Sequence, residues 1–410
     1  MLGKSVEELI RAHEGIEKEV YLDLENSAPV PKEVVDAMLP YFMEKAYGNP
    51  TITHKLGWEA YETILKASKQ IAKYIGAKSA EELNFTPGET EANNLALMGT
   101  AFANSEKGKK IIISKIEPLS IIHTAKLLKR YGFSITEIPV NREGFINLEE
   151  LSRAVDKETI LVSIMTVNHE IGTIEPIKEA VEVVKDKNPE VIFHTDASDA
   201  YGKIPLDVRK LSVDLMTLSS YKILGPRGIG ALYVKEGTKV RRIIEGQIGT
   251  QNLWPGVENT PLIVGFRKAS ELAFNNFKAN IAHMRGLRDK LMNGILETIS
   301  DSLLNGPKGD KRVPDNVNIS FLHCEGESIT IELSLNGIYV SSGSACTRRI
   351  LQPSHVLTAI GRRFEEAHGS ILMKVTRYHT DDDINYVLSV FPKAIERLRR
   401  ISPSKGEINV

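Results

Sequence analysis

One lysine of the sequence stands where a buried strand is expected to end. Lys222 follows the apolar run 213–218 and the small polar residues Ser219 and Ser220. A lysine whose charged form is destabilised by burial or by nearby positive charge becomes nucleophilic and can form a Schiff base with a carbonyl group. Lys222 is therefore a candidate for covalent chemistry. A lysine that reaches from a strand end to the solvent is the alternative interpretation.

Two other segments place polar groups at the ends of expected strands. Asp196 ends the apolar run 191–195, where its carboxylate could keep a pyridine nitrogen protonated; a turn aspartate is the alternative. Residues 84–94 are typical of a strand end, a glycine turn and a helix start. The backbone N–H groups of that start, with the Thr90 hydroxyl, could hold a phosphate. A plain helix cap is the alternative there, because threonine and glutamate are favoured at helix starts.

The three features together are more specific than any one of them. A phosphate cup, a partner for a pyridine nitrogen and a Schiff-base lysine follow one another along the chain, each at the end of a strand. Open α/β sheets bind their ligands at the carboxyl ends of strands. The combination predicts a site for pyridoxal 5'-phosphate (PLP), whose ring acts as an electron sink when its nitrogen is protonated.

The elements that would position this site follow a regular order. Short apolar runs alternate with helical patterns, which predicts an α/β fold with a mainly parallel, doubly wound sheet. The runs of this sheet are 110–114, 159–165, 191–196 and 215–218. A polar helix is expected over 5–19, before a strand over 20–24. A helical region over 261–300 leads to a smaller α+β unit, with strands expected over 317–322, 338–341 and 370–375 and a helix over 381–400.

These elements divide the chain into three parts. Residues 1–19 would form a helical extension, residues 20–262 a large PLP-binding domain and residues 263–410 a small C-terminal domain.

The composition is that of an ordinary globular protein. The 410 residues are 42% hydrophobic and 26% charged, with a formal net charge of -1, which argues against nucleic acid or an anionic membrane as a partner. The sequence has no apolar run of 18 residues and has charges near its start, so we expect a cytoplasmic protein. The two cysteines, Cys324 and Cys346, have no metal-ligand spacing and form no disulfide framework, so no metal site is expected.

Motifs along nearly the whole chain resemble those of one enzyme group. The sequence is similar to fold-type I PLP enzymes of the class V aminotransferase group, and most of all to the cysteine desulfurases. Residues 341–347, Ser-Ser-Gly-Ser-Ala-Cys-Thr, resemble the persulfide-cysteine signature of that family and are its most specific match. The other matching segments are Tyr21-Leu22-Asp23, Gly48-Asn49-Pro50, 85–94, 159–172, 194–203 and 213–234.

The resemblance implies a role for each site residue. Lys222 would hold the cofactor as a Schiff base, and Asp196 would pair with the ring nitrogen. Cys346 would take the sulfur of L-cysteine, so that alanine leaves and a persulfide remains. Arg348 and Arg349 follow Cys346 closely, and their positive charge would favour its thiolate. The other residues implied to bind the cofactor are Glu89, Thr90, Asp199, Ser219 and Tyr221.

The resemblance also implies partners. We expect a homodimer that passes sulfur to an acceptor protein, for iron–sulfur clusters or thio-cofactors. Cys324, in a turn after an expected strand, is interpreted as structural or incidental.

Several positions depart from the family pattern. Pro118 replaces a histidine that stacks on the ring, and His169 replaces an asparagine that contacts the substrate. Asp199 replaces a glutamine on the ring hydroxyl, Tyr221 a phosphate-binding histidine, and Val257 a threonine that the neighbouring subunit lends to the phosphate. We hypothesise that His169 takes over proton transfer, because an imidazole titrates near neutral pH. A histidine that only fills the space of the asparagine is the alternative.

The most consequential departure is Leu372, which replaces the arginine that grips the substrate carboxylate in the family. The loss of such a clamp removes charge-assisted hydrogen bonds and weakens binding on the order of a hundredfold. Lys374 lies two residues further along the same expected strand, so both side chains should face one side of it, roughly 7 Å apart. We hypothesise that Lys374 supplies the missing positive charge to the substrate; a lysine on a solvent face is the alternative.

The sequence thus predicts a PLP-dependent, cysteine desulfurase-like enzyme that acts on L-cysteine or a related amino acid. Two alternatives remain. The first is a PLP lyase or aminotransferase with another amino substrate, which the departures at Leu372, Asp199 and Pro118 would suit. The second is a catalytically weakened sulfur carrier or scaffold that keeps the fold and Cys346.

Overall fold

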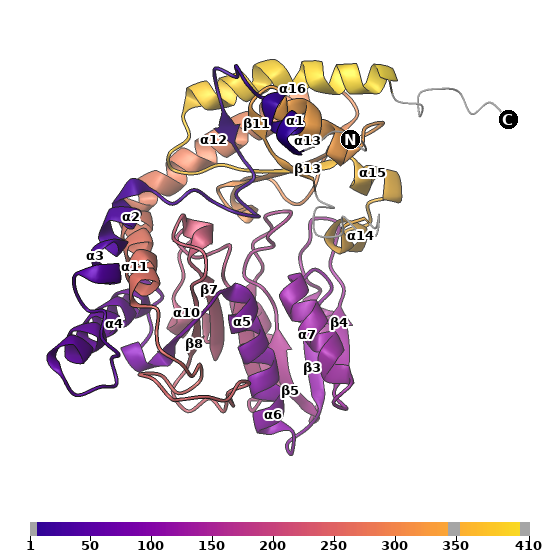
Figure 1. Cartoon of the computed structure of the whole chain (residues 1–410). Helices are drawn as coiled ribbons and strands as arrows, with labels where there is room; N and C mark the ends of the chain where they lie inside the picture. Colours follow the sequence, from indigo (N-terminus) through magenta and orange to yellow (C-terminus); the bar gives the residue numbers. More distant parts are fainter. Residues whose placement is uncertain (1–5, 343–352, 402–410) are drawn as a thin grey trace.

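The computed structural model describes residues 6–342 and 353–401. Its larger part is a seven-stranded sheet between helices, and a smaller sheet with its own helices lies across one end of the large one (Figure 1). No helix of the described residues is long and apolar enough to cross a membrane.

The large sheet is mainly parallel, as the sequence predicts. Its strand β8 runs antiparallel to both neighbours, β2 and β7, whereas the remaining neighbouring pairs are parallel. In spatial order the strands are β2 (Leu83–Thr86), β8 (Gly230–Val234), β7 (Leu215–Ser219), β6 (Ile192–Asp196), β5 (Thr159–Ser163), β3 (Lys110–Ser114) and β4 (Ser134–Ile138).

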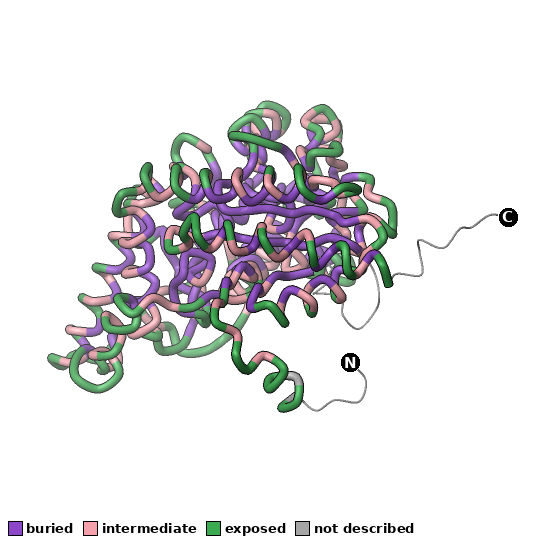
Figure 2. The backbone as a smooth tube through the Cα atoms, turned by 90° about the horizontal axis from the view of Figure 1, so that it is seen from above, coloured by how far each residue is buried: buried purple, intermediate pink, exposed green. Residues whose placement is uncertain are grey.

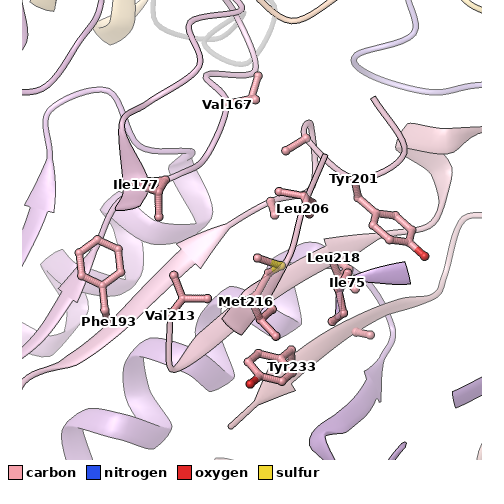
Figure 3. Packing of buried hydrophobic residues seen from close by; sticks show 14 of the residues in the cluster. Ile75, Val167, Ile177, Phe193, Tyr201, Leu206, Val213, Met216, Leu218 and Tyr233 are labelled. Atoms are coloured by element: carbon pink, nitrogen blue, oxygen red, sulfur yellow. The ribbon is translucent and has the colours of Figure 1, made fainter. Parts of the chain in front are cut away.

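Helices cover both faces of this sheet because the strands are apolar on both faces. Successive residues of a strand pack into different hydrophobic clusters. Ile192 of β6 and Leu215 of β7 belong to the cluster on one face of the sheet, and their neighbours Phe193 and Met216 belong to the cluster on the other face. Figure 3 shows Phe193, Val213 and Met216 within the second of these clusters. In Figure 2 the strands in the interior are coloured as buried, and the exposed residues lie on the outer turns of the helices.

The helices on the first side are α5 (Glu89–Asn94), a π-helical turn (Leu95–Gly99), α6 (Thr100–Asn104) and α7 (Leu119–Lys129). Those on the second side include α4 (Lys55–Tyr74), α8 (Leu148–Ala154), α9 (Ile177–Lys187) and α11 (Thr260–Phe274). Shorter helices are α2 (Lys32–Met38), α3 (Pro40–Met43) and α10 (Val208–Leu211).

The smaller sheet is antiparallel, with the order β12 (Ser341–Ser342), β13 (Ser370–Lys374), β10 (Asn316–Phe321) and β9 (Ser302–Leu304). Helices α12 (Phe277–Thr298), α13 (Gly326–Ser334) and α16 (Asp381–Ile401) accompany it, and α14 (His355–Ala359) and α15 (Phe364–His368) complete the region.

One face of the smaller sheet is apolar and the other polar. Ile371 and Met373 of β13 lie in the cluster that α12 and α16 contribute to, so Leu372 and Lys374 point away from that cluster. On β10 the polar face carries Asn316 and Asn318, which both donate to the Glu170 carbonyl of the large sheet region at 3.1 Å. The polar face therefore looks toward the large sheet.

The chain differs from the sequence expectations at four places. The strand expected over 338–341 is two short strands in different sheets, β11 (Ile338–Tyr339) and β12. The helix expected over 5–19 is only α1 (Val6–Arg11), and the chain turns at Gly15, whose φ is +89°. The strand expected over 20–24 pairs only at β1 (Val20–Tyr21), with β11 (Ile338–Tyr339), and Val20 packs into the cluster of the smaller sheet. The helical region 261–300 is two helices, because Asn276 adopts a left-handed conformation (φ +57°) between them.

Candidate active site

The predicted site residues Asp196, Ser219 and Lys222 lie at one edge of the large sheet. Asp196 ends β6 and pairs in register with Thr217 of β7, and Ser219 ends β7. Lys222 follows in a one-turn 3₁₀ helix, Tyr221–Ile223, which closes with a bond from the Gly225 N–H to the Ser220 carbonyl at 2.9 Å. A Cβ at Gly225 would approach the Ser220 Oγ to 2.2 Å, so this turn requires glycine.

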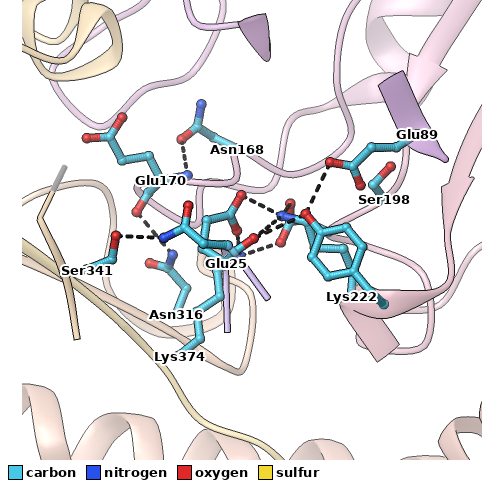
Figure 4. A network of polar contacts seen from close by, with 12 residues as sticks. Glu25, Glu89, Asn168, Glu170, Ser198, Lys222, Asn316, Ser341 and Lys374 are labelled. Carbon is cyan, nitrogen blue, oxygen red and sulfur yellow. Dashed lines mark hydrogen bonds and ion pairs between the residues drawn. The ribbon is translucent and has the colours of Figure 1, made fainter. Parts of the chain in front are cut away.

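Lys222 and Lys374 share the same two carboxylates. The Lys222 Nζ lies 2.5 Å from Glu25 Oε1 and 3.1 Å from Asp199 Oδ2. The Lys374 Nζ lies 2.5 Å from Glu25 Oε2 and also contacts Asp199 Oδ1. The four side chains form a closed ring of alternating charge, here named the charge ring (Figure 4). Both lysine side chains are 2% exposed, so the ring is shielded from solvent.

The ring keeps its members ionised. Burial would lower the pKa of Lys222, but Asp199 and Glu25 outweigh burial and hold that pKa well above its usual value. Burial would raise the pKa of Asp199, but Lys222 and Lys374 hold it well below its usual value. Burial alone would favour a neutral, nucleophilic Lys222 amine, and the two carboxylates reverse that tendency.

A further ion pair extends the charge ring. The Lys203 Nζ lies 2.7 Å from Asp315 Oδ2 and 3.6 Å from Asp199 Oδ1, with both partners buried. Asp199 thus faces three lysines, which accounts for its strongly lowered pKa.

Asp196 is held by neutral hydrogen bonds. Its Oδ2 accepts from the Asn93 amide at 2.7 Å and its Oδ1 from the Ser198 backbone N–H at 2.8 Å. Burial raises the pKa of Asp196, and these hydrogen bonds oppose that rise. These hydrogen bonds fix the orientation of the carboxylate, and no cation among the described residues is paired with it.

Glu89 and Tyr221 lie on the other side of Lys222. The Tyr221 hydroxyl is 3.1 Å from the Glu25 carbonyl and 3.4 Å from Glu89 Oε1. Burial raises the pKa of Glu89 to about 7, with Asp196, Asp199 and Glu25 adding to the rise and Lys222 opposing it. Glu89 thus changes charge near neutral pH.

His169 follows Asn168, whose amide oxygen accepts from the backbone N–H groups of Glu170 and Ile171 and so fixes this loop. Burial lowers the pKa of His169 to about 4, so its imidazole is neutral at physiological pH. Its Nδ1 is buried and has no hydrogen-bond partner among the described residues.

The structure places the remaining predicted residues as follows. Thr90 is exposed in the first turn of α5, and Val257 is 67% exposed in a loop. Pro118 precedes α7, and Leu372 is buried in β13 opposite Asn318 and Ser341. Cys324 is half-buried near the Ile395 carbonyl of α16. Cys346 lies outside the described residues, as do Arg348 and Arg349.

Sequence reasoning missed Glu25, although it contacts two predicted site residues. It lies in a loop directly after the matching segment Tyr21-Leu22-Asp23. No local pattern points to it, because its partners Lys222 and Lys374 lie 197 and 349 residues away along the chain.

Comparison with known proteins identifies the class. A family model described as aminotransferase class-V matches residues 20–387, and the chain belongs to this family. Its fold is thus confirmed as that of the fold-type I PLP-dependent enzymes.

Within this class the chain belongs to the cysteine desulfurases. A relative named cysteine desulfurase IscS, from Dictyoglomus turgidum, is 46% identical over 392 residues, which are 96% of this chain and 98% of the relative. A solved structure named NifS-like protein has a TM-score of 0.86 and 34% identity, covering 94% of this chain and 100% of that chain. Another, named SspA in complex with cysteine, has a TM-score of 0.76 and 30% identity, covering 88% and 100%. The family depends on PLP.

The pocket offers groups that fit this cofactor. Buried polar atoms without a partner among the described residues mark a place for a polar ligand, because such atoms are costly to leave unpaired. Those around Lys222 are Ser198 Oγ, Ser219 Oγ, Ser220 Oγ, Asn93 Oδ1, His169 Nδ1 and Glu89 Oε2. Glu89 fits beside a phosphate only when protonated, since a carboxylate would repel it. The residues around Asp196 therefore fit the ring of the cofactor. At Glu89 the fit to the phosphate depends on pH, because only the protonated side chain is compatible with it.

Proposed function

We propose that the chain is a cysteine desulfurase that uses PLP, converts L-cysteine to L-alanine and leaves the sulfur as a persulfide on Cys346. The observation that carries this proposal is the meeting, at one edge of the large sheet, of a strand-end lysine, the fixed carboxylate of Asp196 and several buried polar atoms without a partner among the described residues. PLP supplies an electron sink that stabilises negative charge at the substrate Cα.

Different residues of the chain would bind different parts of the cofactor. Asp196, oriented by Asn93 and Ser198, would hold the proton of the ring nitrogen. Asp199 would face the ring hydroxyl. Ser219, Thr90, Tyr221 and protonated Glu89 would surround the phosphate, and Lys222 would carry the aldehyde carbon and move the Cα proton.

Two residues would serve the substrate. Lys374 would attract the carboxylate of L-cysteine in place of an arginine, as a point charge without a fork. His169, neutral because burial lowers its pKa to about 4, would act as a hydrogen-bond partner and exchange a proton only through a transient charged form.

The chain on either side of the Cys346 segment is anchored at the site, which supports a role for that cysteine. Before the segment, Ser341 pairs with Leu372 and accepts from the Asn26 amide at 2.9 Å. After it, Ser354 donates to Glu170 Oε2 at 2.5 Å, next to His169. The nucleophile would take sulfur from the substrate and hand it to an acceptor protein, in the cytoplasm, for iron–sulfur clusters or thio-cofactors.

A homodimer is part of the proposal. Large apolar side chains are exposed together on α2, α3 and α4, among them Leu39 (55%), Phe42 (55%), Met43 (79%) and Trp58 (61%). Contiguous exposed apolar residues mark interaction surfaces. Sedimentation of the wild type should give a dimer and that of Met43→Asp a monomer; a monomeric wild type would contradict this.

The test of the activity uses purified, PLP-loaded protein and L-cysteine. Sulfide in the presence of a thiol and alanine should appear in equal amounts, and Cys346→Ser should release neither while keeping its PLP absorbance. Cys324→Ser is the matched control and should remain active. Alanine without sulfur transfer to Cys346 would overturn the proposed role of that cysteine.

A second candidate function is a sulfur carrier or scaffold with little turnover. It is favoured by the charge ring, which holds the Lys222 amine charged, together with the apolar Leu372 at the family's arginine position. A screen of amino acids for changes in PLP absorbance would separate it from a lyase or aminotransferase with another substrate.

A further inference from the structure

Glu25 occupies a central place in the pocket. Its two carboxylate oxygens reach two lysines from different sheets: Oε1 contacts Lys222, which follows β7, and Oε2 contacts Lys374, which ends β13. Asp199 makes the same pair of contacts from the other side. Each carboxylate therefore bridges both lysines, and the charge ring ties the large sheet to the smaller one (Figure 4).

The loop that carries Glu25 is fixed by further contacts. The Glu25 carbonyl accepts from the Tyr221 hydroxyl at 3.1 Å, and the Asn26 amide donates to Asp23 Oδ1 at 2.6 Å and to Ser341 Oγ at 2.9 Å. The Arg227 guanidinium donates to Ser27 Oγ at 2.7 Å. Glu25 is thus held against Lys222 by its backbone as well as by its side chain.

The balance of charge in the ring decides how readily Lys222 reacts. Two carboxylates and two ammonium groups are matched in a site that is almost closed to water, where ion pairs are strong and an uncompensated charge is costly. The removal of one carboxylate would leave two ammonium groups facing a single carboxylate. The removal of one ammonium would leave two carboxylates facing the other. The first change favours a free amine and the second opposes it.

We propose that Glu25 is a positioning residue that keeps the Lys222 amine charged and non-nucleophilic until a ligand opens the charge ring. The amine must lose a proton before it can attack a carbonyl carbon, and Glu25 stabilises the state that keeps this proton. Entry of the cofactor would then require Glu25 to give up its contact with Lys222. Glu25 would therefore set the rate at which the site becomes loaded.

The test measures the reactivity of Lys222 without PLP or L-cysteine. Formaldehyde and cyanoborohydride methylate free amines: the amine attacks the carbonyl carbon, water leaves, and hydride from cyanoborohydride reduces the C=N bond. The methylation rate of Lys222 is followed by peptide mass spectrometry on the full chain between pH 7 and pH 10. Lys185, which pairs with the buried Asp214 and not with a carboxylate of the charge ring, is the internal reference.

Glu25→Gln keeps the shape of the side chain and removes its charge. Lys222 should be methylated at least about tenfold faster in this variant, because each unit by which the pKa falls raises the free amine tenfold. The rate at Lys185 should stay the same. An unchanged rate at Lys222 would overturn the proposal. A slower rate would also overturn it, since Glu25 would then act as the base that frees the amine.

Lys374→Met provides a second test with the opposite sign. It leaves Glu25 to Lys222 alone and Asp199 to Lys222 and Lys203, so methylation of Lys222 should slow. Faster methylation in a variant whose thermal unfolding stays cooperative would contradict the proposal even if Glu25→Gln failed to fold. Because neither cofactor nor cysteine is used, the result is independent of the assay for sulfide and alanine.

Discussion

The two sides of the pocket are built in different ways. Asp196 is held by an amide and a backbone N–H, and no cation of residues 6–342 or 353–401 is paired with it. Lys222 is held by two carboxylates that it shares with Lys374. The hydrogen bonds to Asp196 come from Asn93 of α5 and from Ser198 in the turn after β6. They orient the carboxylate so that it could pair with a ring nitrogen. The charge ring joins two sheets, and it must open before its lysine can react.

The contrast teaches that the fold of a family can be kept while the charged residues beside its reactive lysine differ. Asp196 and Lys222 lie at neighbouring strand ends of the large sheet, whereas Glu25, Asp199 and Lys374 form the charge ring beside Lys222. Under the proposed function, this ring and Leu372 would set the charge next to the substrate. Variants should therefore differ in kind: changes at Glu25 and Lys374 should alter stability and binding, whereas changes at Lys222 and near Asp196 should also alter catalysis.

The largest effect is expected for Lys222→Ala. It removes the reacting amine and leaves Glu25 and Asp199 facing Lys374 and Lys203 only, and the loss of one partner from a buried ion pair costs about 3–5 kcal/mol. Sulfide release should vanish, and the free energy of unfolding measured in urea should fall by an amount in that range. A variant as stable as the wild type would mean that the ring contributes little to the fold.

A smaller effect is expected for Lys374→Met, which sharpens the comparison on the substrate side. If Lys374 attracts the substrate carboxylate, the KM for L-cysteine should rise about tenfold, since a hydrogen bond to a charged group contributes about 1.5–3 kcal/mol. The kcat should change less. Steady-state kinetics in which kcat falls and KM stays constant would assign Lys374 to the ring alone.

His169→Gln should change the rate without changing its pH dependence. Because burial lowers the pKa of His169 to about 4, the residue stays neutral from pH 5.5 to pH 8 and cannot produce an acid limb in that interval. The acid limbs of kcat/KM for wild type and variant should coincide there. A limb near pH 6.5 that disappears in the variant would show a titrating imidazole.

The last prediction concerns Glu117, a buried carboxyl away from the charge ring. It accepts from the Ser114 hydroxyl at 2.6 Å and from the Met165 N–H, and burial raises its pKa to about 8. The unfolded chain loses this proton at about pH 4.3, whereas the folded protein keeps it up to about pH 8. The contribution of this group to the free energy of unfolding therefore falls as the pH rises between these two values. Glu117→Gln should therefore show a smaller loss of unfolding free energy between pH 5 and pH 8 than the wild type.

Much of the scaffold could be predicted from the sequence because its signals are local. Strands β3, β6 and β7 are short runs that are apolar on both faces, and Asp196 and Lys222 follow directly from where two of them end. The break between α11 and α12 was not foreseen, although the pair Asn275-Asn276 is a signal for it, because asparagine adopts the left-handed conformation more readily than most residues. The charge ring was missed for another reason: three of its four ion pairs join residues 175, 197 and 349 positions apart, and no local pattern pairs them.

The central claim is that Lys222 is the amine that joins the cofactor, and reduction with borohydride tests it most directly. The protein is incubated with PLP, treated with borohydride and digested, and the labelled peptide is identified by mass spectrometry. We expect the label on Lys222 and its absence from that peptide in Lys222→Ala. Label on Lys374 or Lys203 in the wild type, or no label at any of the three lysines, would contradict the account.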